Sequence, residues 1–86
     1  MHYTYILQSK KDNCLYTGCT KDLRKRFDEH IQGRVYPTRA RGPFKIIYYE
    51  ACWDRGDAFA REKYLKSVYG KRYLKNRLKR FLSLTG

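Results

Sequence analysis

The sequence predicts a small α/β (α+β) fold, in which a three-stranded, mainly antiparallel sheet is flanked by helices in the order β-β-α-β-α-α. Three observations predict it. Two short β-rich runs near the N-terminus are separated by turn-forming residues, and a third β-rich run follows a helical segment. The remaining segments place apolar residues at helical spacing. A sheet this small needs helices to cover it, so a layered packing is expected.

The N-terminal hairpin is the first element. Residues 3–8 and 14–18 are rich in Tyr, Thr and branched aliphatic residues, which strands favour. Residues 9–13 (SKKDN) between them are typical turn formers. The pattern predicts an antiparallel hairpin over residues 3–18.

The first helix follows the hairpin. Leu23, Phe27 and Ile31 recur every four residues and predict one apolar stripe. Thr20 is the expected N-cap. Gly33 is the expected C-terminal stop.

A third strand and two further helices complete the chain. Residues 44–53 (FKIIYYEACW) contain a continuous apolar run, which predicts a strand buried on both faces. Asp54 is the expected cap of a helix that runs to about Tyr69 and stops at Gly70. Another helix is expected from about residue 71 to residue 83. The direction of the third strand is left open by the pattern.

Composition limits the function classes. The chain has 86 residues, which predicts a single domain over residues 1–86. It carries 20 Lys and Arg against 8 Asp and Glu, a net charge of +12 that favours a nucleic acid or an anionic membrane as partner. No window approaches the roughly 18 apolar residues of a membrane span, and no secretion signal is recognisable. We therefore expect a cytoplasmic protein with no membrane role.

The three cysteines do not suggest a disulfide framework or a structural zinc site. Their number is odd, and Cys14, Cys19 and Cys52 lack paired CxxC spacing. We expect them to be small, buried hydrophobic residues.

Glu62 conflicts with the apolar face predicted for the second helix. It falls in the middle of that face on a helical wheel, where a buried carboxylate costs several kcal/mol unless it is paired or bound to a metal. Two interpretations remain open: a structural ion pair, for example with an arginine from elsewhere, or a metal-binding or acid–base carboxylate in a cleft. The predicted apolar face comprises Ala58, Phe59, Leu65, Val68 and Tyr69.

Arg26 and His30 are one turn apart on the first helix and flank its apolar stripe. They are either a boundary ion pair beside a half-buried histidine, or part of a cleft wall. Tyr5 and Tyr16 on the hairpin are either core aromatics or members of the same site. Gly18 ends the second strand, where a backbone or ligand can approach closely.

Together these residues resemble the GIY-YIG nuclease domain over essentially the whole chain. The two signature elements correspond to Tyr3-Thr4-Tyr5 and Tyr16-Thr17-Gly18. The arginine of the family matches Arg26, the residue one turn later matches His30, and the metal-binding glutamate matches Glu62. The chain is most similar to the short, single-domain bacterial members, which are related to the nuclease domain of an excision-repair endonuclease.

The resemblance implies a metal-dependent DNA endonuclease. Glu62 would hold one Mg²⁺ or Mn²⁺, and Arg26 would stabilise charge on the phosphate. Tyr16 would be the general base toward water. Tyr5 and His30 would position water or phosphate and share the proton. A non-catalytic nucleic-acid-binding module on the same fold is the alternative.

The chain departs from the family pattern at a few positions. Tyr3 replaces the first Gly, both elements have Thr in place of Ile, and Cys19 stands where some members have Lys. Asn76 is the nearest match to an asparagine that many members carry. A protein partner or DNA shape is expected to supply specificity. The residues expected to contact DNA are Lys21, Arg24, Arg34, Arg39, Arg41, Lys66 and Asn76.

Overall fold

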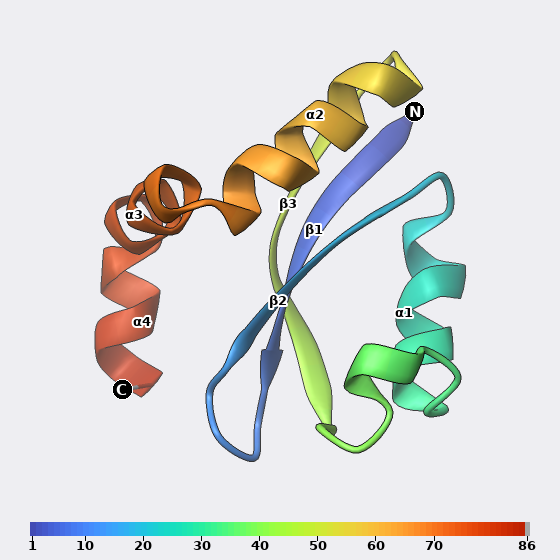
Figure 1. The fold of residues 1–86 in the computed structure, drawn as a ribbon. Helices are drawn as coiled ribbons and strands as arrows, with labels where there is room; N and C mark the ends of the chain where they lie inside the picture. Colours follow the sequence, from blue (N-terminus) through green and yellow to red (C-terminus); the bar gives the residue numbers. More distant parts are fainter. Residues whose placement is uncertain (86) are drawn as a thin grey trace.

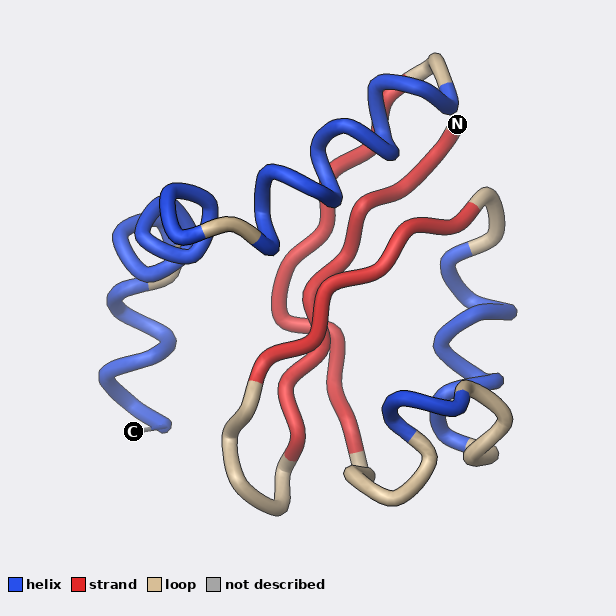
Figure 2. Tube along the Cα trace, in the orientation of Figure 1, coloured by secondary structure: helices blue, strands red, loops and turns tan. Residues whose placement is uncertain are grey.

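A computed structural model describes residues 1–85 and confirms the predicted α+β fold (Figures 1 and 2). The three strands form one antiparallel sheet in the order β2-β1-β3, which settles the direction of the third strand. The elements are β1 (His2–Ser9), β2 (Leu15–Thr20), α1 (Leu23–Ile31), η1 (Tyr36–Thr38), β3 (Phe44–Cys52), α2 (Arg55–Lys66), α3 (Val68–Arg77) and α4 (Lys79–Thr85).

The central strand is β1, and it is the most buried element. All six residues from Thr4 to Ser9 are buried, because β1 pairs on both sides and is covered on both faces. The prediction that the third strand is buried on both faces was wrong. β3 is an edge strand in which only Phe44 is buried, while Tyr49 is 55% exposed.

Two apolar clusters lie on opposite faces of the sheet, because successive strand residues alternate between the faces. Tyr5, Leu7 and Phe44 form one cluster, against which α1 packs. Ile6 packs with Leu65 of α2 and with a leucine of α3 in the other. Figure 1 shows α1 on one side of the sheet and α2 to α4 on the other.

The N-terminus of α1 differs from the prediction. Asp22, not Thr20, is the N-cap: its Oδ1 accepts a hydrogen bond from the Lys25 backbone N–H at 3.1 Å. Thr20 lies two residues earlier, and its Oγ1 accepts from the Asp22 N–H at 3.1 Å. A carboxylate next to the first free N–H groups also complements the helix dipole.

The C-terminus of α1 is closed by Gly33, as predicted. Gly33 has a φ of +74°, in the left-handed region that glycine adopts easily. Its N–H bonds to the His30 carbonyl at 3.1 Å, and the Arg34 N–H bonds to the Glu29 carbonyl at 2.9 Å. This closure holds the last turn, which carries His30, in one position.

The junction of α2 and α3 corrects a predicted boundary. α2 ends at Lys66 rather than Tyr69, because Ser67 leaves the helical conformation and its Oγ caps α3 by accepting from the Gly70 N–H at 3.2 Å. Gly70 does not stop a helix; it lies in the first turn of α3. A Cβ there would overlap the Tyr64 carbonyl oxygen, so glycine permits the tight corner.

The predicted third helix is divided in two. α3 begins at Val68, and Leu78 separates it from α4. Val68 and Tyr69 are each 71% exposed, so they do not belong to the apolar face predicted for α2. Leu74 of α3 is buried in the cluster on this face of the sheet, and Leu78 packs beside it.

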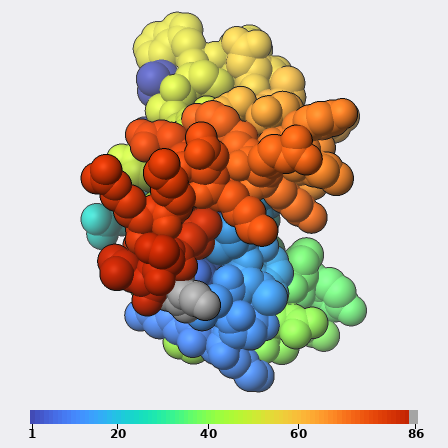
Figure 3. All heavy atoms as spheres, turned by 90° about the vertical axis from the view of Figure 1, so that its left-hand side faces the viewer, coloured from blue at the N-terminus to red at the C-terminus, as the bar shows by residue number. Residues whose placement is uncertain are grey.

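Figure 3 views the side on which α3 and α4 lie. In this view α3 and α4 lie beside the hairpin, and the residues around 34–43 lie on the other side of the hairpin. None of the helices in residues 1–85 combines the length and the apolar character needed to cross a membrane. The expected burial of the cysteines was wrong, because Cys14 is exposed and both Cys19 and Cys52 are partly exposed.

Candidate active site

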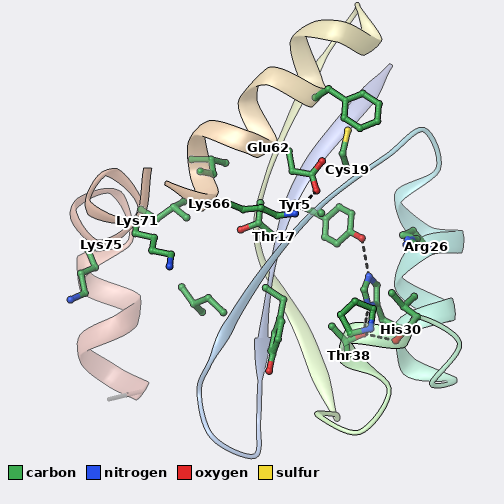
Figure 4. A pocket seen from close by; sticks show the side chains of 18 residues that line it. Tyr5, Thr17, Cys19, Arg26, His30, Thr38, Glu62, Lys66, Lys71 and Lys75 are labelled. Carbon is green, nitrogen blue, oxygen red and sulfur yellow. Dashed lines mark hydrogen bonds and ion pairs between the residues drawn. The ribbon is translucent and has the colours of Figure 1, made fainter. Parts of the chain in front are cut away.

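A cavity of about 800 Å³ extends from α1 across β2 to α2 and α3 (Figure 4). β2 is an edge strand, so side chains from both faces of the sheet reach this cavity around it. The five residues predicted to be catalytic all line it, although they come from four different elements: Tyr5, Tyr16, Arg26, His30 and Glu62.

Gly18 makes room for Tyr5 to reach the site. The two residues are directly opposite in the β1–β2 pairing. A Cβ on Gly18 would overlap the hydroxyl and ring of Tyr5, so the ring lies directly over the glycine. Because Gly18 has no side chain, the Tyr5 ring crosses β2 and delivers its hydroxyl to α1.

A chain of hydrogen bonds connects Tyr5 to the segment after α1. The Tyr5 hydroxyl lies 2.8 Å from His30 Nε2, and His30 Nδ1 lies 2.7 Å from Thr38 Oγ1. The Thr38 hydroxyl donates to the Val35 carbonyl at 3.3 Å. Its oxygen must therefore accept from Nδ1–H, which leaves Nε2 to accept from Tyr5. The chain selects the neutral Nδ1–H form of His30.

Burial keeps both members of this pair uncharged. Desolvation raises the pKa of Tyr5, and the nearby Arg26 guanidinium offsets this only in part. Desolvation also lowers the pKa of His30, and the positive charge of Arg26 lowers it further. A neutral phenol that donates to a neutral imidazole is the arrangement that these shifts favour.

Thr38 is the site residue that sequence reasoning missed. It lies in η1, in the segment between α1 and β3 that also carries Arg34, Arg39 and Arg41. The residue is 3% exposed. No periodicity marks it, because its position follows from how the loop folds back onto α1. A Thr in an otherwise basic loop, shortly after a candidate histidine, was the only available signal.

Arg26 fits both interpretations that the sequence left open. Its Nη1 lies 3.2 Å from Glu29 Oε1, which is the boundary ion pair. The side chain is 40% exposed and also lines the cavity. An ion pair this exposed contributes little to stability, so the guanidinium is available to an anionic ligand.

Glu62 is paired, although not with an arginine from elsewhere. Its Oε2 lies 3.0 Å from Lys66 Nζ, one turn later on α2. The Glu62 side chain is 16% exposed, whereas that of Lys66 is 57% exposed. The lysine is therefore free to move away without unfolding the helix, and the carboxylate faces the cavity beside Tyr5 (Figure 4).

The donor set around Glu62 fits one hard cation. No group of three His, Cys, Asp or Glu side chains with metal-binding geometry occurs within residues 1–85. Glu62 is the one carboxylate among the residues that line the cavity. Mg²⁺ keeps several waters and is commonly held by one or two carboxylates together with substrate phosphate oxygens. A single carboxylate on an open cavity suits such an ion.

Tyr16 lies between the apolar cluster and the cavity. Its ring packs edge-on against Phe44, with 5.6 Å between ring centroids. Its hydroxyl makes no hydrogen bond to any residue in the described part of the chain. The ring is thus held by packing while the hydroxyl remains available to a water or substrate.

The residues expected to contact DNA do not all gather at the cavity. Lys66 lines it, as does Cys19. Lys21 and Arg24 line a different hollow beside α1. The remaining residues of this prediction are exposed and lie outside the cavity: Arg34, Arg39, Arg41 and Asn76.

Comparison with known proteins shows the family of this chain. The model of the GIY-YIG catalytic domain matches residues 1–82. The chain belongs to the GIY-YIG family. This is a nuclease family whose members generally depend on a divalent metal.

Several relatives carry the name UPF0213. A UPF0213 protein of Clostridium perfringens is 44% identical over 69 residues, which cover 79% of this chain and 73% of the relative. A UPF0213 protein of Halalkalibacterium halodurans is 38% identical over 88 residues, covering 99% and 85%. The solution NMR structure of a UPF0213 protein from Bacillus halodurans matches with a TM-score of 0.54 and 36% identity, covering 87% and 82%.

Proposed function

We propose that this chain is a metal-dependent DNA endonuclease in which residues 1–86 act as one catalytic domain. The observation that carries the proposal is the convergence of a guanidinium, a carboxylate, two phenols and an imidazole on one cavity at the edge strand β2. Hydrolysis of a phosphodiester needs an activated water, charge neutralisation on the phosphate and help for the leaving oxygen. These side chains can supply each of them.

Arg26 is the residue that neutralises phosphate charge. A guanidinium presents a planar fork of donors that matches two phosphate oxygens, which lysine cannot reproduce. Its present partner, Glu29, is exposed enough that exchange for phosphate costs little.

Tyr16 is the general base toward water. Its hydroxyl has no hydrogen-bond partner among the described residues, whereas that of Tyr5 is committed to His30. Tyr16 lines the same cavity as the Arg26 guanidinium that would hold the phosphate. The two tyrosines therefore take different roles.

Tyr5 and His30 hold and orient a proton. With the imidazole in its Nδ1–H form, Nε2 is the acceptor for the Tyr5 hydroxyl proton. Because its proton points to Nε2, the Tyr5 oxygen can accept a hydrogen bond from a water, and the shared proton can shift toward His30. Thr38 keeps the imidazole in the orientation that this exchange requires.

Glu62 is the residue that would hold one Mg²⁺ or Mn²⁺ together with phosphate oxygens of the substrate. When bound, such an ion supplies Lewis-acid stabilisation of the phosphate and of the leaving oxygen. Lys66 would leave Glu62 at that point, and its exposed side chain allows this.

Cleavage of labelled DNA tests the proposal. Duplex, branched and single-stranded substrates would be incubated with Mg²⁺ or Mn²⁺ and with wild type or Glu62→Gln. Asp28→Asn is the matched control, because it removes one negative charge from an exposed position outside the cavity. We expect metal-dependent cutting by wild type and the control, and a cleavage rate about 10²–10³-fold lower for Glu62→Gln, with DNA binding retained.

Two results would change the conclusion. If Glu62→Gln cut DNA as fast as wild type, Glu62 would not be part of the active site. Tight binding by wild type without cutting of any substrate, at any metal tested, would favour the non-catalytic nucleic-acid-binding module.

A further inference from the structure

Three lysines line the cavity beyond Glu62, at the end formed by α2 and α3. Lys66, Lys71 and Lys75 follow one another away from Glu62 in Figure 4. Lys71 and Lys75 are four residues apart on one helix, so they lie on the same side of it. Neither of them takes part in the reaction proposed above.

Lys71 and Lys75 have no ion-pair partner within residues 1–85. The one carboxylate that lines the cavity, Glu62, already faces Lys66. Like charges at this helical spacing destabilise an isolated helix by about 0.2–0.5 kcal/mol, so stability does not account for them. Their position favours an anionic ligand that occupies this end of the cavity.

The corner between α2 and α3 turns these lysines toward the cavity. Ser67 interrupts the helix, and Gly70 allows α3 to pack directly on the backbone of Tyr64 and Leu65. The sequence predicts a continuous helix up to Tyr69, and such a helix would send the chain after Lys66 in a different direction. The same corner buries Leu74, which lines the cavity between Lys71 and Lys75.

We propose that this end of the cavity binds the backbone of the cleaved DNA strand beside the scissile phosphate, with Lys71 and Lys75 each contacting a phosphate. This proposal rests on the proposed function and deepens it. Four residues of helix span about 6 Å. That distance is close to the rise of two stacked nucleotides, at roughly 3.4 Å each. The strand then leaves the site over α3, rather than over the basic segment 34–43.

Salt-dependent binding tests the lysine pair. Affinity for a short labelled DNA would be measured by fluorescence anisotropy across a salt series, in chelator so that cutting does not occur. Lys71→Gln/Lys75→Gln is the test variant. Lys63→Gln/Arg72→Gln is the control, because it removes two charges from exposed positions of α2 and α3 outside the cavity.

We expect the test variant to bind more weakly and to lose about 1.4–1.8 from the slope of log affinity against log salt, which corresponds to two lost phosphate contacts. The control should lose less than half of that. Equal losses in both variants would mean a diffuse charge effect, and an unchanged slope in the test variant would remove these lysines from the interface. Either result would overturn the proposal.

Neutral phosphates locate the contact. Uncharged methylphosphonate linkages would be placed one at a time along the strand, and binding compared between wild type and Lys71→Gln/Lys75→Gln. We expect linkages on one side of the cut to weaken DNA binding by wild type. The same linkages should not weaken binding by the variant any further, because the linkage and the substitutions remove the same phosphate–lysine contact. Full additivity at every position would contradict the proposal.

These measurements also separate the two proposals. Binding that depends on Lys71 and Lys75 in a protein that cuts no DNA would end the endonuclease proposal and leave the lysine contacts standing. If the lysine substitutions left cutting unaffected at all salt concentrations, the lysine contacts would be rejected and the endonuclease proposal would stand.

Discussion

The two walls of the cavity are built differently. On the α1 wall, Tyr5 and His30 are buried and joined by short hydrogen bonds that continue to Thr38. On the α2 wall, Glu62 makes one ion pair with a largely exposed lysine. Apart from the partly exposed Arg26 guanidinium, the first wall is preorganised and uncharged, whereas the second is open and charged. The contrast suggests that the α1 wall sets geometry, while the α2 wall is where ions and substrate are exchanged.

The largest effect is expected from a substitution in the α2 wall, and it should change the cleavage rate without changing stability. Glu62→Gln should lower the cleavage rate by about 10²–10³-fold, the usual loss when one electrostatic stabiliser is removed. Its free energy of unfolding should change by less than about 1 kcal/mol, because the ion pair it loses is solvent-accessible. Single-turnover cleavage and urea denaturation measure the two quantities. A large loss of stability would mean that the α2 wall is structural as well.

Substitutions in the α1 wall should chiefly lower the stability of the fold. Gly18→Ala places a Cβ against the Tyr5 ring and should destabilise the fold by about 1–3 kcal/mol, as overpacking does. Gly42→Ala is the control, since its Cβ would meet Phe44 at an ordinary 3.5 Å. Urea denaturation gives both values. If Gly18→Ala were as stable as the control, the Tyr5 ring would not depend on the glycine for its position.

Thr38 tests the hydrogen-bond chain itself. Thr38→Val keeps the shape but leaves the Nδ1–H of His30 without its acceptor, which should cost about 1–3 kcal/mol. Thr38→Ser keeps the hydroxyl and should recover most of that loss. The ¹⁵N chemical shifts of His30 should report the Nδ1–H form in wild type and a mixture of tautomers in Thr38→Val. The same tautomer in both proteins would show that Thr38 does not select it.

The smallest effect is a pH dependence of stability. Burial lowers the pKa of His30 in the folded state below its ordinary value of about 6.5. The unfolded chain then binds more protons than the folded one between the two pKa values. Stability should therefore fall as the pH is lowered through about 6.5, until the folded pKa is passed. The His30→Asn variant should lack the part of the stability loss at low pH that comes from His30. Urea denaturation at a series of pH values would measure this.

Elements with a strong local pattern were predictable from the sequence. The hairpin, α1 and the closing Gly33 follow from turn chemistry, apolar spacing and the preference of glycine for positive φ. The residues that converge on the cavity were also identifiable, because their types and spacing follow a known family pattern. Glu62 was identified because a carboxylate conflicts with the predicted apolar face, although that face wrongly included Val68 and Tyr69.

Errors arose where neighbours in space outweigh neighbours in sequence. The apolar run in β3 suggested a buried strand, but strand order decides burial, and β1 is the central strand. A helical pattern continued past Lys66, but Ser67 caps a new helix because α3 can then pack on the sheet. Local propensity differs little between these alternatives, so tertiary packing selects one.

The sequence by itself determined the type of each element, the positive charge of the chain and the set of reactive side chains, because these depend on local chemistry and spacing. Only the tertiary structure decided that Thr38 orients His30, that Lys66 faces Glu62, and that Lys71 and Lys75 line the same cavity. These relations depend on where the loop and the α2–α3 corner direct the chain. Contacts between segments far apart in sequence carry no periodic signal, and packing alone brings them together.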